Sequence, residues 1–119
     1  MGKLDDALEL YNKEMTDKLG IKKVDQVLLR AAAKACGPAL YKKDASKVAC
    51  SNKDEMERIR QNFLIKKLGL KDTPKLEEGL KAVCQEMGSR NRNKYRAIFY
   101  YLLIKKFRKS SMFKQPKEA

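Results

Sequence analysis

Apolar residues recur every three or four positions along most of the chain, a spacing that predicts amphipathic helices. The first stripe predicts a helix from about Lys3 to Leu19, and the second predicts a helix from about Val24 to Cys36. The second stripe is rich in alanine, which indicates close approach to a neighbouring helix. Gly37-Pro38 ends this helix, because glycine and proline are typical of helix C-termini.

Two further helices are predicted from their caps. Residues 39–51 keep no period, so we expect a loop there with room for a short helical turn. Ser51 is a suitable N-cap for a third helix from about Lys53 to Leu68. Thr73-Pro74 supplies a cap and a first-turn proline for a fourth helix, which Gly88 ends.

The last helix is predicted from about Asn91 or Asn93 to Arg108 and contains the longest apolar run, residues 97–104. A helix that is apolar on all sides must be surrounded by other elements. We therefore expect an all-α fold, a single compact array of about five helices with the C-terminal helix at its centre. Residues 1–113 would form this domain, and residues 114–119 a basic flexible tail.

A short repeat links two of the predicted helix ends. Lys-Leu-Gly-Ile-Lys at 18–22 and Lys-Leu-Gly-Leu-Lys at 67–71 match at an offset of 49 residues. The simpler interpretation is a helix end closed by a left-handed glycine, with the next aliphatic residue packed back on the last turn. The alternative is that two helical hairpins, 3–36 and 53–87, are pseudo-equivalent.

Charge is distributed unevenly along the chain. The 119 residues carry 28 Lys+Arg and 15 Asp+Glu, a formal net charge of +13. Residues 60–119 account for +11 of this, with 16 basic and 5 acidic residues. Between Gly88 and Lys117 there are ten basic residues and no acid. Such a tract attracts nucleic acid, acidic protein surfaces or anionic lipid.

The first part of this tract is the main candidate site for an anion. It lies at the predicted start of the last helix and consists of Arg90, Arg92, Asn93, Lys94 and Arg96. Cations are unfavourable at a helix N-terminus, where free amides and the helix dipole favour anions. Together these groups would suit a phosphate or carboxylate. In the alternative, acids of the third helix (Glu55, Glu57) or the fourth (Glu77, Glu78, Glu86) neutralise the cluster.

The second part is a basic patch at the other end of the same helix, made of Lys105, Lys106, Arg108 and Lys109. These cations fit the negative end of the helix dipole, so local stability also explains them. Aromatic residues are interleaved with both groups, as in nucleic-acid stacking surfaces. Their helical spacing nevertheless favours packing in the core.

Several classes of function are excluded or disfavoured. The sequence has no histidine, which excludes Ser-His-Asp and Cys-His catalysis and histidine-containing zinc sites. Adjacent acid pairs point in different directions on a helix and form no acid/base pair. Cys36, Cys50 and Cys84 form no C-x-x-C and are odd in number, so we expect small buried hydrophobes rather than disulfides or metal ligands. We expect no enzyme activity and no cofactor.

The cellular location is predicted from what the sequence lacks. Its longest apolar run of eight residues is far short of the roughly 20 needed to span a bilayer. The N-terminal residues include no apolar signal-peptide stretch. A cytoplasmic protein is therefore expected.

Two sequence segments carry a resemblance. NFLIKKLGL at residues 62–70, followed by SRNRNKYRAIFYYLL at 89–103, resembles a family of small, mostly bacterial proteins known only as a domain of unknown function. The resemblance runs from the first predicted helix to about Phe113. It implies a compact domain of about five helices and no activity. Family members are often far less basic than this chain. The resemblance therefore favours the Lys-Tyr-Arg segment, rather than the total charge, as the candidate site.

The leading functional hypothesis is a non-catalytic module that binds an anionic partner. The partner would be the phosphate of nucleic acid, engaged through the helix-start cluster with the second basic patch adding charge. The alternative is a protein-interaction or structural domain, in which basic residues pair internally or meet an acidic protein.

Overall fold

The computed structural model describes residues 3–42, 46–88 and 94–109. Helical segments make up most of these stretches, and the only extended pairing among them is an isolated bridge between Lys47 and Tyr95. In chain order the segments are α1 (Lys3–Asp17), α2 (Gln26–Cys36), the 3₁₀ segment η1 (Gly37–Tyr41), α3 (Lys53–Ile59), the π-helical segment η2 (Arg60–Lys67), α4 (Pro74–Met87) and α5 (Arg96–Lys106). The predicted all-α fold is confirmed.

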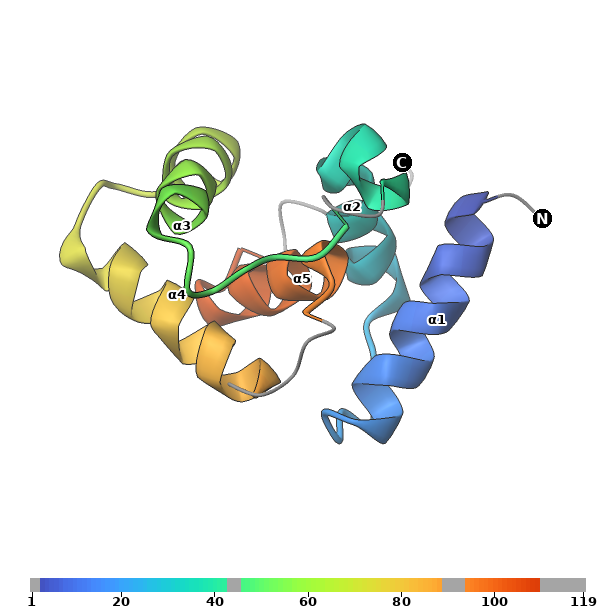
Figure 1. The fold of residues 1–119 in the computed structure, drawn as a ribbon. Coiled ribbons are helices and arrows are strands. Elements are labelled where there is room, and N and C mark those ends of the chain that lie inside the picture. The colour runs from blue at the N-terminus through green and yellow to red at the C-terminus, as the bar shows by residue number, and fades with distance from the viewer. Residues whose placement is uncertain (1–2, 43–45, 89–93, 110–119) are drawn as a thin grey trace, which may run out of the picture.

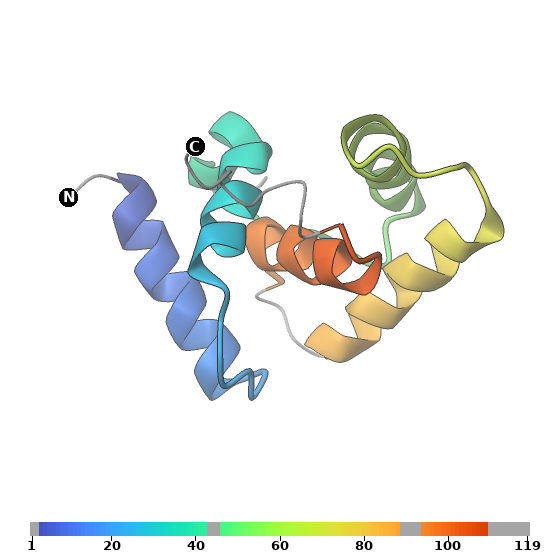
Figure 2. The ribbon, with the colours of Figure 1, turned by 180° about the vertical axis from the view of Figure 1, so that it is seen from behind.

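Helix α5 occupies the centre of the array. In Figure 1 it lies between α1 and α2 on one side and α3 and α4 on the other, and Figure 2 shows the same order from behind. Seven of its eleven residues are buried, on all sides of the helix: Ala97, Ile98, Phe99, Tyr101, Leu102, Leu103 and Ile104. Each large aliphatic or aromatic side chain buried in this way contributes about 1.5–3 kcal/mol. The apolar run thus specifies the central element.

Helix α2 makes the most extensive contact with α5. Its alanines Ala32 and Ala33 are fully buried, as expected for a small-residue face that lets another backbone approach closely. Asp25 caps the helix by accepting a hydrogen bond from the amide of Leu28 at 3.1 Å. The Asp25 amide in turn donates to the hydroxyl of Tyr101 at 3.0 Å, which ties the start of α2 to α5.

The predicted third helix changes its hydrogen bonding at Arg60. Residues 60–67 form a π-helix, and the amide of Leu68 donates to the carbonyl of Phe63, five residues earlier, at 2.9 Å. The Phe63 ring stacks on Tyr100 of α5, with centroids 4.0 Å apart and planes at 14°. Phe63, Leu64 and Leu68 are all buried. Helical periodicity predicted the element, but not this widening of its turns.

The cap of α3 also differs from the predicted one. Asn52, not Ser51, is the N-cap, and its side chain accepts a hydrogen bond from the amide of Glu55 at 3.1 Å. Asparagine is as good a cap as serine, so the start of the helix moves by one residue without loss of a partner. Thr73 and Pro74 begin α4 as predicted.

The two Leu-Gly-aliphatic motifs end helical segments in the same way. Gly20 and Gly69 have φ angles of 70° and 71°, in the left-handed region. The amide after each glycine donates to a carbonyl six residues earlier, Ile21 to Met15 and Leu70 to Leu64, both at 3.0 Å. The helix-end interpretation of the repeat is therefore confirmed.

Helix α5 begins at Arg96, later than the predicted start at Asn91 or Asn93. Tyr95 has extended backbone angles because it pairs with Lys47 in the isolated bridge. Two hydrogen bonds flank this bridge, from the Val48 amide to the Lys94 carbonyl at 2.8 Å and from the Arg96 amide to the Ser46 carbonyl at 2.7 Å. Asn91, Asn93 and the predicted tail, residues 114–119, lie outside the described residues.

None of the helices in the described stretches is both long and apolar enough to cross a membrane.

Candidate functional site

The helix-start cluster is only partly within the described residues, because Arg90, Arg92 and Asn93 lie outside them. Its other two members face inward. Lys94 is buried, with 8% of its surface exposed. Arg96 pairs with Glu55 of α3 at 2.5 Å, and about 14% of its side chain and 15% of that of Glu55 are exposed.

The Arg96–Glu55 pair joins three parts of the fold. Burial alone would lower the pKa of Arg96, but hydrogen bonds to Tyr100 and Glu55 more than offset it and raise the pKa. The guanidinium therefore stays charged. Glu55 also accepts a hydrogen bond from the Ala49 amide at 3.2 Å. Breaking such a pair leaves a buried charge without its partner, so we assign Arg96 a role in holding α5, α3 and residues 46–50 together.

Three of the four residues of the second basic patch are open to solvent, whereas Lys109 is half-buried and does not line the recess. Lys105, Lys106 and Arg108 are exposed, and with Lys23 from the α1–α2 connection they line a recess of about 480 Å³. Glu86 of α4 is the acidic residue in this lining. Four cations and one carboxylate give the recess a net positive charge, which favours an anionic partner.

The end of α5 positions these cations. The amide of Arg108 donates to the carbonyl of Lys105 at 3.1 Å, and the amide of Lys109 donates to that of Ile104 at 2.9 Å. This is the Schellman pattern, in which the residue after the C-cap adopts left-handed backbone angles. Arg108 takes that position with φ 58°. The chain thus reverses here and places Arg108 beside Lys105 in the lining of the recess.

The aromatic residues near the basic groups belong mainly to the core. Phe99 and Tyr101 are buried, while Tyr95, Tyr100 and Phe107 are half-buried and packed against the core. Tyr95 contacts Tyr11, with ring centroids 5.3 Å apart. Only the edge of this set reaches the recess, where the Lys105 ammonium lies 5.9 Å from the Tyr101 ring. The expected core packing of these five aromatic residues is confirmed.

The cysteines depart from expectation. Cys50 and Cys84 form a disulfide, with Cα atoms 6.1 Å apart, which joins the segment before α3 to α4. The prediction of three unpaired cysteines was therefore wrong, because a separation of 34 residues carries no local signal of pairing. Cys36 is free, and burial raises its pKa to about 12, although Arg96 acts in the opposite direction. Cys36 is half-buried and packs against the core, so it is less enclosed than the expected small buried hydrophobe.

Metal binding has no support within residues 3–42, 46–88 and 94–109. Those residues contain no group of three or more histidine, cysteine, aspartate or glutamate side chains able to hold a metal ion.

Comparison with known proteins identifies the family. Residues 10–111 match the model of a family described as a protein of unknown function, DUF2853. The chain belongs to this family. No curated protein matches the chain. The DUF2853 match covers α2 to α5 entirely and most of α1, so the fold described above is that of the family domain.

Membership of DUF2853 assigns no activity, so any role of the surface rests on its geometry. The match includes Lys105, Lys106 and Arg108 as well as Glu55 and Arg96. Both the inward pair and the open basic recess are thus features of the DUF2853 domain in this chain.

Proposed function

We propose that this domain is a non-catalytic module that binds the phosphate backbone of nucleic acid through the basic recess at the end of α5. The observation that supports the proposal is the convergence of Lys23, Lys105, Lys106 and Arg108 on one recess with a single carboxylate in its lining. Phosphate contacts by lysine and arginine supply most of the affinity in binding that does not depend on sequence.

The shape of the surface agrees with backbone recognition rather than base reading. Tyr101, the tyrosine in the lining of the recess, is 1% exposed. Its ring is therefore covered and offers no face to a base. Recognition through charges alone predicts weak preference for sequence and strong dependence on salt.

Salt dependence provides the test. Binding of a fluorescent DNA duplex is measured by anisotropy at increasing salt concentration. If all four cations contact phosphates, the log–log slope should be about −3.6, at about −0.9 per contact. The triple variant Lys105→Gln, Lys106→Gln, Arg108→Gln should make the slope less negative by about 2.7, because three phosphate contacts are lost.

A matched control separates the recess from total charge. Lys66, Lys67 and Lys71 are exposed on or just after η2, away from the recess, and their change to glutamine removes the same charge. This control should keep the slope of the unaltered protein. No binding at low salt, or equal loss in both triple variants, would refute the proposal.

The protein-interaction or structural alternative has one observation in its favour. Arg96 of the helix-start cluster pairs with Glu55 inside the fold instead of facing solvent. In that alternative the recess meets an acidic protein, and the duplex shows no retention at any salt concentration.

A further inference from the structure

A second cavity lies between the start of α3 and α4. Its volume is about 680 Å³, within the range of small-molecule sites. Both residues of the disulfide, Cys50 and Cys84, are in its lining and are half-buried. Met56 and Leu80 add apolar surface to the same lining. A disulfide on a cavity wall is accessible to a small reactant, unlike one enclosed in the core.

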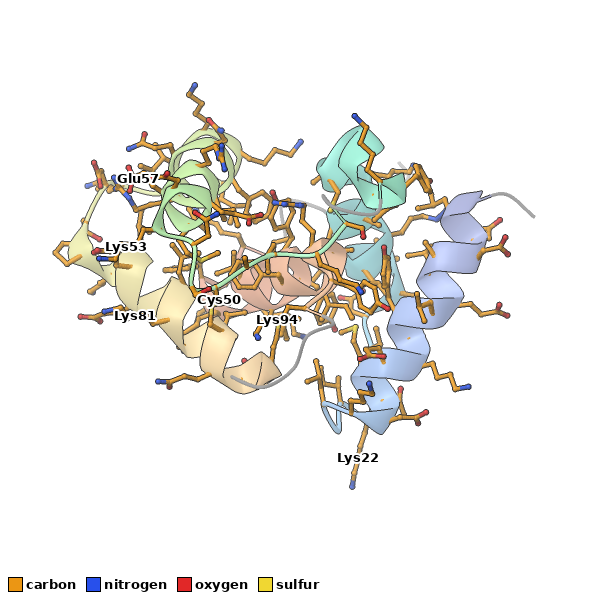
Figure 3. All side chains as sticks on the ribbon, in the orientation of Figure 1. Lys22, Cys50, Lys53, Glu57, Lys81 and Lys94 are labelled. Atoms are coloured by element: carbon orange, nitrogen blue, oxygen red, sulfur yellow. A yellow bond between two sulfur atoms is a disulfide. The ribbon has the colours of Figure 1, made fainter. Side chains whose placement is uncertain are left out.

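Each cysteine has a lysine three residues away on the same wall. Lys53 follows Cys50 at the start of α3, and Lys81 precedes Cys84 on α4, where a spacing of three places both on one face. Both lysines are exposed, and within the described residues neither forms an ion pair. Figure 3 shows them on the side where α3 and α4 face each other, with Cys50 in the segment before α3, beside α4.

The third cation of the lining, Arg60, is already paired with acids. Arg60 is bound by Glu57 at 2.6 Å and by Asp72. The hydrogen bond that Arg60 donates lowers the pKa of Glu57. Glu57 therefore stays ionised and paired with Arg60. Glu77 is the remaining acid in the lining. Lys53 and Lys81 are thus the cations of the described lining without an ion-pair partner, and their ammonium groups can contact a negatively charged reactant directly.

We propose that this cavity is a thiol–disulfide exchange site for a low-molecular-weight thiol that carries carboxylates, the class to which glutathione belongs. The thiolate sulfur of the reactant attacks one Sγ of the Cys50–Cys84 bond. That bond breaks, its electron pair leaves on the other Sγ as a thiolate, and a mixed disulfide forms. A second thiolate attacks the reactant's sulfur in the mixed disulfide and releases the remaining cysteine thiolate together with the small-molecule disulfide.

The lysines act on both partners of this exchange. Their ammonium groups attract the carboxylates of the reactant and stabilise the departing cysteine thiolate. The two protein thiolates then take protons from solvent, so two thiols are oxidised for one disulfide reduced. Reduction frees the segment before α3 from α4, while the bridge between Lys47 and Tyr95 still holds that segment to α5.

The first experiment counts thiols in the full-length protein. Purified, unreduced and denatured, the chain should titrate as one free thiol, Cys36, and as three after reduction. Three free thiols before reduction would overturn the proposal. Acid-quenched reactions with glutathione should show a mixed disulfide by intact mass, and its absence while glutathione opens the bond would contradict the two-step exchange.

The second experiment tests the lysines. The rate of disulfide opening is measured by trapping the released thiols, with glutathione and with uncharged 2-mercaptoethanol. The variant Lys53→Gln, Lys81→Gln should react about tenfold more slowly with glutathione, because both charge contacts to the carboxylates of the reactant are lost. With 2-mercaptoethanol the rate should fall less, because attraction of carboxylates plays no part.

The matched control is Lys66→Gln, Lys67→Gln, which removes the same charge from exposed positions outside the cavity. Its rates should equal those of the unaltered protein. Equal rates for the cavity variant and the control with both thiols would overturn the role of Lys53 and Lys81. Circular dichroism of each variant establishes that the fold is intact. The outcome is independent of nucleic-acid binding.

Discussion

At the scale of single residues, Arg108 combines backbone strain with charge. A non-glycine residue in left-handed geometry costs roughly 1 kcal/mol, yet here the position carries a cation of the basic recess. Glycine would close the same turn at lower cost. The presence of arginine is therefore consistent with a role for its charge, at some expense in stability.

This compromise predicts opposite effects of one substitution. Arg108→Gly should raise the free energy of unfolding by up to about 1 kcal/mol, measured by urea denaturation, because glycine relieves the left-handed strain. It should also make the salt slope of duplex binding less negative by about 0.9. Arg108→Lys keeps the charge and the strain, so it should change neither quantity. A less stable Arg108→Gly would contradict the strain argument.

At the scale of elements, α4 and the end of α5 pack together at a glycine of α4. The geometry of α4 itself does not require glycine there. Gly79 lies in the middle of α4, where alanine would be preferred by about 1 kcal/mol. A Cβ atom at this position would overlap the ring of Phe107, the C-cap residue of α5. Close approach of the two elements explains why a glycine stands in the middle of a helix.

Gly79→Ala should therefore destabilise the domain in spite of its better helix propensity. We expect a loss of about 1–3 kcal/mol from overpacking against Phe107, measured by thermal or urea unfolding. In a Phe107→Ala background the same substitution should be neutral or stabilising by up to about 1 kcal/mol. The double-mutant cycle isolates this coupling, and equal effects in both backgrounds would disprove it.

Helical elements could be predicted because periodicity and caps are local. The apolar run at 97–104 and the proline at 74 each determine an element from neighbouring residues alone. Local periodicity does not contain the π-helical turns of η2, nor the stacking of Phe63 from this segment on Tyr100, 37 positions away in the chain. The same holds for the start of α5, which depends on the bridge between Lys47 and Tyr95.

At the scale of the whole molecule, long-range pairing decided which charged residues face solvent. Glu55 was one of several acids that could neutralise the helix-start cluster, and only the fold shows that it meets Arg96. The position of Lys105 and Lys106 at the end of the last helix followed from the sequence, but the contribution of Lys23 to the same recess did not. The role of Arg90 and Arg92 stays a prediction.

The disulfide has the largest predicted effect on the stability of the whole molecule. It closes a loop between residues separated by 34 positions, and loops of this size are expected to contribute about 3–4 kcal/mol by restricting the unfolded chain. Guanidinium unfolding with a phosphine reductant should therefore show a lower free energy of unfolding than without it. A variant with Cys50→Ala and Cys84→Ala should match the reduced protein and ignore the reductant, while Cys36→Ala should keep the full difference. The same unfolding midpoint in both conditions would show that the bond does not constrain the unfolded chain. The fully buried core consists of other residues, with Cys50 and Cys84 packed against it, so the reduced chain should retain its helical circular dichroism below the transition.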